Sequence, residues 1–132
     1  MARTLVKNHR QSPRKVRLVA DLVRGKKVNH ALTVLSVLNK KASDPIRGAI
    51  QSAVANATNN LKMNPDRLYV KEIRVDEGIV LKRYMPRARG SAFQIRKRTS
   101  NIFVSLDTKG HEIVSRKSQP AVELEQKESS EE

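Results

Sequence analysis

The sequence predicts an α+β fold in which helices come first and strands follow. Apolar residues recur at helical spacing up to about residue 57, and they alternate every second residue from residue 68 onward. A long basic stretch, from about residue 78 to 100, separates two alternating segments. The chain has 132 residues, of which 38 % are hydrophobic and 3 % aromatic. This length and composition predict one domain with a small core, which we place in residues 1–110.

The first strand and the first helix are predicted from short local patterns. Residues 3–7 are compatible with a short strand at a sheet edge. Ser12 is a suitable N-cap, Pro13 suits the first helical position, and Gly25 is a natural end for the helix. The apolar face of this helix consists of Val16, Val19, Ala20 and Val23.

Two more helices follow before the pattern changes. The second is predicted from about residue 29 to 38. The third begins at Ser43 or Asp44, which we expect to cap it, has Pro45 just inside its start, and ends near Asn59. The expected buried stripes are Ala31, Val34, Leu35 and Leu38 in the second helix, and Ile46, Ala49, Ile50, Ala53, Val54 and Ala57 in the third.

The second half of the chain predicts one long β-hairpin. Residues 68–75 and 101–106 have the composition and alternation of strands, and Pro86 and Gly90 punctuate the segment between them. If pairing is symmetric about Ala88, Asp76 lies opposite Ser100 and Tyr69 opposite Asp107. At about 3.3 Å per residue, residues 79–88 span roughly 30 Å, so the arm (about 78–100) is expected to project beyond the body.

Charge is concentrated in two stretches, although the net charge of the whole chain is +14. Residues 1–27 hold nine Lys or Arg against one acid, and residues 82–98 hold seven and no acid. Cations in the first turns of a helix oppose its dipole, so an anionic partner explains them better than folding does. Residues 111–132 are polar, and the five Glu and one Lys of 121–132 predict a disordered acidic tail.

The sequence offers no catalytic, metal or cofactor site. It has no Cys, its three His are far apart, and it lacks glycine-rich phosphate loops and carboxylate pairs with acid–base partners. No apolar run approaches the ~18 residues of a membrane span, so no membrane partner is expected. We therefore predict a binding protein that is not an enzyme, with no cofactor and no metal.

Three classes of nucleic-acid binder remain open on this basis. A helix-turn-helix DNA reader is disfavoured because residues 29–38 offer no Arg, Lys or Gln to read bases. An architectural DNA-binding protein could use the arm, with Met85 and Pro86 as a wedge. A structured-RNA binder is favoured by the five Arg among seven basic residues in 82–98. Arginine content alone does not separate RNA from DNA.

Three segments resemble one protein family. They are VDEGIVLKRYMPRARGSAFQIRKRTSNIFV, SPRKVRLVADLVRGKKV and SAVANATNN. Together they are similar to the bacterial form of a universal large-subunit ribosomal protein family, number twenty-two, over about residues 3–106. The resemblance implies three helices on a three-stranded antiparallel sheet with a long protruding hairpin. It implies a structural constituent of the large ribosomal subunit, in the cytoplasm.

The resemblance also implies partners and sites. The partners are several domains of large-subunit ribosomal RNA, neighbouring ribosomal proteins and, near the hairpin tip in the exit tunnel, the nascent polypeptide and macrolide antibiotics. The architectural DNA-binding protein is the alternative. The expected RNA-binding residues are Arg10, Arg14, Lys15, Arg17, Lys26, Lys27, Lys82, Arg83, Arg87, Arg89, Arg96, Lys97 and Arg98. The expected tunnel-facing tip consists of Tyr84, Met85, Pro86, Arg87, Ala88, Arg89, Gly90 and Ser91.

The chain departs from this family at three places. Ser91 stands where a basic residue is usual, which removes one expected phosphate contact at the tip. Asn101 stands where His is usual, and it remains a polar hydrogen-bonding residue. The segment from Asp107 to Glu132 extends past the usual end of the family.

Overall fold

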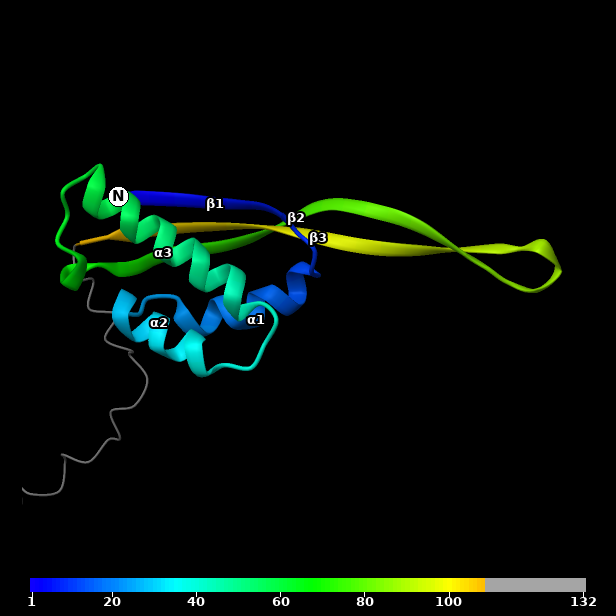
Figure 1. Ribbon diagram of the computed structural model, residues 1–132, viewed down its shortest axis with the longest axis horizontal. Coiled ribbons are helices and arrows are strands. Elements are labelled where there is room, and N and C mark those ends of the chain that lie inside the picture. The colour runs from blue at the N-terminus through cyan, green and yellow to red at the C-terminus, as the bar shows by residue number, and fades with distance from the viewer. Residues whose placement is uncertain (109–132) are drawn as a thin grey trace, which may run out of the picture.

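The secondary structure follows the predicted order, as a computed structural model that describes residues 1–108 shows (Figure 1). The predicted tail, residues 111–132, lies outside the described residues. The three helices and three strands are β1 (Ala2–His9), α1 (Pro13–Val23), α2 (Val28–Val37), α3 (Ser43–Asn59), β2 (Tyr69–Pro86) and β3 (Ala92–Asp107). There are also two short 3-10 turns. The first, η1 (Pro65–Arg67), precedes β2, and the second, η2 (Ala88–Gly90), forms the hairpin tip.

The ends of the helices agree with the sequence except for the cap of α3. Ser12 occupies the N-cap of α1 with an extended backbone, although its side chain makes no capping hydrogen bond. Gly25 ends α1 with a φ of 74°. The expected cap of α3 by Ser43 or Asp44 is wrong, because Ala42 occupies that position. Ser43 is already buried inside the helix, and its Oγ donates to the Leu38 carbonyl at the end of α2 (3.0 Å).

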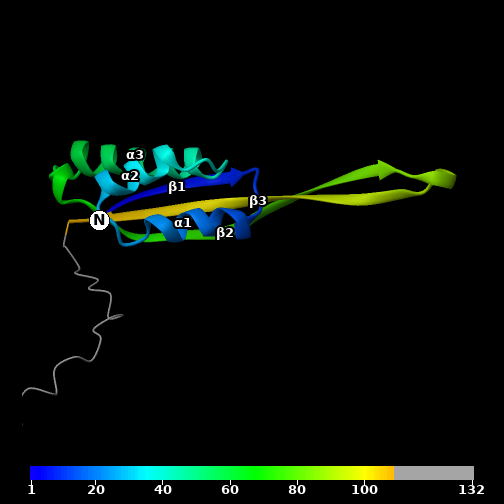
Figure 2. The same ribbon diagram turned by 90° about the horizontal axis from the view of Figure 1, so that it is seen from below.

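The core lies between the helices and one face of an antiparallel sheet whose strand order is β1-β3-β2. α3 packs against β1 and β3, α1 packs against β2, and α2 packs against α3. Figure 2 shows α3 beside β1 and α1 beside β2. The predicted stripes are confirmed: all their members are buried except Val34, Leu38 and Val54, which are half-buried. The predicted edge strand is also confirmed, as β1.

The register of the hairpin differs from the symmetric prediction. Tyr69 does pair with Asp107, but Asp76 faces Asn101 instead of Ser100. β2 carries an extra residue at Lys71 and another at the Gly78–Ile79 step, because the register shifts at both places. Each bulge moves the pairing by one residue, so the arm is centred on Arg89 and not on Ala88.

The arm is a two-stranded ribbon that projects well past the body (Figures 1 and 2). β2 and β3 remain paired out to Pro86 and Ala92. Between residues 79 and 98 every side chain is exposed except the half-buried Leu81 and Ile95. The ribbon therefore has almost no core of its own, and its basic side chains face solvent.

Candidate nucleic-acid interface

A groove of about 720 Å³ lies where the arm leaves the body. It is formed by the β1–α1 connection, the first turn of α1, the α2–α3 connection and both strands of the arm. Among residues 1–108, seven basic side chains and no acidic one line it. The basic residues are Arg10, Lys15, Lys41, Arg83, Arg96, Lys97 and Arg98.

The groove unites the two basic stretches that were separate in the sequence. Arg10 and Lys15 come from the N-terminal stretch, and Arg83 comes from the arm. A concave surface of one charge sign concentrates the field and attracts a polyanion. Arginine guanidinium groups can grip phosphate oxygens in pairs, whereas lysine acts as a point charge. The groove is thus suited to a nucleic-acid backbone.

Sequence reasoning missed one cation of the groove. Lys41 lies in the connection between α2 and α3, directly after Lys40 and outside the two basic stretches. Nothing in its neighbours distinguishes it from a solvated surface lysine. Only the packing of α2 and α3 against the sheet carries this connection to the base of the arm.

The other predicted residues of the N-terminal stretch lie outside the groove. Arg14 is exposed on the first turn of α1. Lys26 and Lys27 lie beyond the far end of that helix, next to the start of β2. There the Lys26 carbonyl accepts the Val70 N–H (2.9 Å), and Lys27 forms a β-bridge with Tyr69. The structure therefore brings together only part of the predicted N-terminal set.

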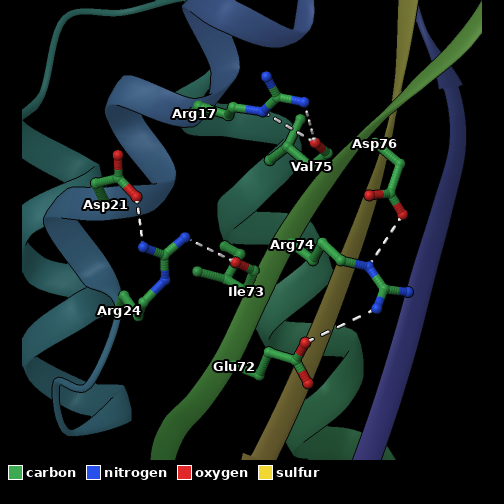
Figure 3. A pocket seen from close by; sticks show the side chains of 8 residues that line it. All are labelled: Arg17, Asp21, Arg24, Glu72, Ile73, Arg74, Val75 and Asp76. Carbon is green, nitrogen blue, oxygen red and sulfur yellow. Dashed lines mark hydrogen bonds and ion pairs between the residues drawn. The ribbon is translucent and has the colours of Figure 1, made fainter.

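Arg17 lies against the outer edge of β2 (Figure 3) and is not part of the groove lining. Its Nε and Nη2 both donate to the Val75 carbonyl, at 3.1 and 3.0 Å. Arg24 makes a similar contact, since its Nη2 donates to the Ile73 carbonyl (3.0 Å) while its Nη1 pairs with Asp21 (2.7 Å). The guanidinium of Arg17 thus already has a protein partner in the fold.

The surface around these contacts differs in charge from the groove. Its lining contains three Arg and three acids, which are Arg17, Arg24, Arg74, Asp21, Glu72 and Asp76. Arg74 lies between its two acidic neighbours on β2, 3.1 Å from Asp76 and 3.9 Å from Glu72 (Figure 3). Charges that cancel locally give no net attraction for phosphate, so this edge is a poor polyanion site.

The arm presents basic residues along both strands. Lys82 pairs across the ribbon with Arg96, and Leu81 pairs with Lys97. Because neighbouring strand residues point to opposite faces and paired residues share a face, Lys82 and Arg96 lie on one face of the ribbon. Leu81 and Lys97 lie on the other face. The arm therefore carries cations on both faces.

The tip is a tight turn held by its own backbone and side chains. The Arg87 N–H donates to the Ser91 carbonyl (2.8 Å), and Ser91 Oγ donates to the Ala88 carbonyl (2.8 Å). Arg89 and Gly90 both have positive φ, at 58° and 71°. All predicted tip residues from 84 to 91 are exposed. The Arg87 guanidinium also lies over the Phe93 ring, 5.9 Å from its centroid.

Within residues 1–108, no three His, Asp or Glu side chains lie together as they would to hold a metal. No helix of this part of the chain is long and apolar enough to cross a membrane.

A small α+β body that carries a basic groove and a projecting basic ribbon defines a nucleic-acid-binding protein. Residues 4–107 match the family described as ribosomal protein L22p/L17e. The chain belongs to this family, and it is a structural, non-enzymatic constituent of the large ribosomal subunit. Its partners are accordingly ribosomal RNA and other ribosomal proteins, and its place is the ribosome.

Individual relatives agree with this assignment. The chain is 56 % identical to the large ribosomal subunit protein uL22 of Herpetosiphon aurantiacus over 106 residues, which cover 80 % of this chain and 94 % of that protein. It is 54 % identical to uL22 of Mycoplasmopsis agalactiae, with 80 % and 93 % covered. It is 54 % identical to uL22 of Bdellovibrio bacteriovorus, with 79 % and 94 % covered. None of these relatives favours the architectural DNA-binding alternative.

Proposed function

We propose that the groove and the arm bind several domains of large-subunit ribosomal RNA at once and thereby support assembly of the subunit. The observation that carries this proposal is the groove, in which seven cations and no acid of the described part of the chain converge at the base of the arm. Phosphates repel one another where RNA helices crowd together, and these cations would neutralise them there. The exposed basic residues of the arm extend the same contact away from the body.

We further propose that the tip, residues 84–91, lines the exit tunnel for nascent polypeptides and borders the space that macrolide antibiotics use. The length of the arm supports this, because the tip lies far from the body (Figure 1). The turn also closes on itself through the Arg87–Ser91 and Ser91–Ala88 hydrogen bonds. A self-contained turn keeps a defined shape where a moving chain passes.

The tunnel proposal is tested with a single introduced thiol, because the chain has no Cys. Ser91→Cys is assembled into large subunits, and ribosomes are stalled with a nascent chain that carries a thiol-reactive cross-linker. We expect a cross-link from position 91 and none from Val37→Cys, a control on the body whose side chain is 82 % exposed.

Co-sedimentation of both variants with large subunits through a moderate-salt wash confirms that they are incorporated. If the incorporated Ser91→Cys protein gave no cross-link, or only the yield of the Val37→Cys control, the placement of the tip in the tunnel would be wrong. The binding of RNA by the groove would remain testable separately.

A further inference from the structure

The base of the arm contains two register shifts that face each other across β3. On one side, β1 pairs in register up to Val6 and resumes at His9. On the other side, β2 pairs in register up to Glu77 and resumes at Val80. Both interruptions lie opposite residues 99–101 of β3, where the three-stranded sheet becomes a two-stranded ribbon.

The β2 side of this region is closed by Thr99. Its side-chain hydroxyl donates to the Ile79 carbonyl at 2.7 Å, and the residue is only 4 % exposed. Gly78 lies directly against it: a Cβ at position 78 would be 2.4 Å from Thr99 Oγ1. The hydrogen bond therefore requires glycine at this position for steric reasons.

The β1 side is closed by two asparagines. Asn8 has a φ of 55°, a left-handed conformation that asparagine tolerates better than most residues. Its N–H donates to Asn101 Oδ1 at 2.8 Å. Its own Oδ1 would lie 3.3 Å from a Cβ at Gly78, so the two irregular segments approach each other. Asn101, which departs from the family pattern, thus has a specific structural contact here.

We propose that Asn8, Gly78, Thr99 and Asn101 form a locked joint that fixes the direction of the arm relative to the body. They are positioning residues for RNA binding. The groove takes Arg10 and Lys15 from the body and its other cations mainly from the arm, and Thr99 lies in its lining. A locked joint holds both halves of the groove in place before RNA arrives, which lowers the ordering cost of binding. This inference rests on the proposed role of the groove.

The first test measures the arm direction without RNA. Cysteines introduced at Val37 and Gln94, both exposed, are labelled with nitroxides in the full chain, and the distance between them is measured by electron paramagnetic resonance. We expect one narrow distance distribution in the otherwise native chain. Thr99→Val keeps the shape of the side chain and removes the hydroxyl, so it should broaden the distance distribution. Thr99→Ser keeps the hydroxyl, so the distribution should stay as narrow as in the native chain.

The same logic gives a second pair of variants on the β1 side. Asn101→Leu removes the acceptor of the Asn8 N–H, and Asn101→Asp keeps it, so only the former should broaden the distribution. This pair keeps the test decisive if Thr99→Val does not fold. A native distribution as broad as that of the variants, or variants as narrow as the native chain, would overturn the locked joint.

The second test separates positioning from direct contact. We expect Thr99→Val to weaken binding to large-subunit ribosomal RNA roughly fivefold, because the RNA must then order the arm as it binds. The dependence of affinity on salt should be unchanged. The salt slope stays because the number of phosphates neutralised stays. If Thr99→Val broadened the distance distribution but left the affinity unchanged, the positioning role would be wrong. If the native chain did not bind the RNA at all, the proposed function of the groove would be wrong instead.

Discussion

Lys71, a bulge residue of β2, forms an ion pair with Asp107 of β3. It is the extra residue of the first bulge in β2, and its Nζ lies 3.1 Å from Asp107 Oδ2 near the end of β3. This hydrogen bond is the main reason that the pKa of Asp107 falls below its ordinary value of 3.8. Burial acts in the opposite direction, and the N–H of Thr108 adds a smaller lowering.

The lowered pKa has a defined consequence for stability. A carboxylate whose pKa is depressed by folding contributes stability above its unfolded pKa, and this contribution is lost as the pH falls through the folded pKa. Lys71→Met should therefore reduce the free energy of unfolding at neutral pH by less than about 1 kcal/mol, because the lysine is substantially exposed. The difference from the native chain should fade below pH 3.8.

Urea unfolding across a pH series measures this effect, with Lys40→Met as the matched control. Lys40 is exposed and forms no ion pair with the described residues, so its replacement should leave the pH profile unchanged. A Lys71→Met deficit that persisted undiminished at the acid end of the series would show that the ion pair is not its cause.

At the scale of elements, α1 and the residues after it cover the outer edge of β2. The Lys26 carbonyl accepts the Val70 N–H, Arg24 reaches the Ile73 carbonyl, and Arg17 reaches the Val75 carbonyl. An uncovered strand edge is a template for pairing with other chains. These contacts give the Val70 N–H and the Ile73 and Val75 carbonyls partners within the body. They explain why a helix that begins with exposed cations also places an arginine toward the sheet.

The two arginines of α1 should therefore respond differently to substitution. Arg17→Met should lower the free energy of unfolding by about 1 kcal/mol, because the Val75 carbonyl loses both of its bonds to the guanidinium. Arg14→Met removes the same charge from an exposed position of the same helix and should change stability by less than about 0.5 kcal/mol. Chemical denaturation of the two variants compares them directly. Equal losses would argue against a role of Arg17 at the strand edge.

At the scale of the molecule, charge is sorted between two surfaces. The groove and arm are purely basic, whereas the edge of β2 beside α1 is balanced. If the groove contacts about seven phosphates, a fourfold rise in salt should weaken binding of ribosomal RNA roughly a thousandfold, at a slope of about 0.7 per phosphate. Because the cations are concentrated in the groove and the arm, we expect these residues to account for most of the salt dependence of RNA affinity.

Paired substitutions test this sorting. Arg96→Gln with Arg98→Gln removes two groove cations and should reduce the salt slope by about 1.4. Lys26→Gln with Lys27→Gln removes the same charge at the opposite end of the body and should change the slope less. Filter binding or fluorescence anisotropy at several salt concentrations measures both. A larger change from the lysine pair would place the main RNA contact away from the groove.

The sequence was sufficient for features that depend on local periodicity. The stripe of Val16, Val19, Ala20 and Val23 is buried as predicted, because a helix that packs on a sheet must bury one face. The register of the arm was not predictable, since the bulge at Gly78–Ile79 depends on contacts with Thr99 and with the distant Asn8. The different roles of Arg14 and Arg17 were hidden for the same reason: charge can be read from the sequence, but the proximity of one guanidinium to β2 cannot.

The position of β3 in the sheet also sets the order in which the chain can fold during synthesis. β1 and β2 both pair with β3, and β3 ends at Asp107. β1 therefore has no strand partner until nearly all of the described chain has been made. The turn at Ala88–Gly90, in contrast, joins strands that follow each other directly, and closing a short loop costs little entropy. Pairing of β2 with β3 can thus start at this turn and extend toward the body, where β1 joins the sheet only after β3 has been made.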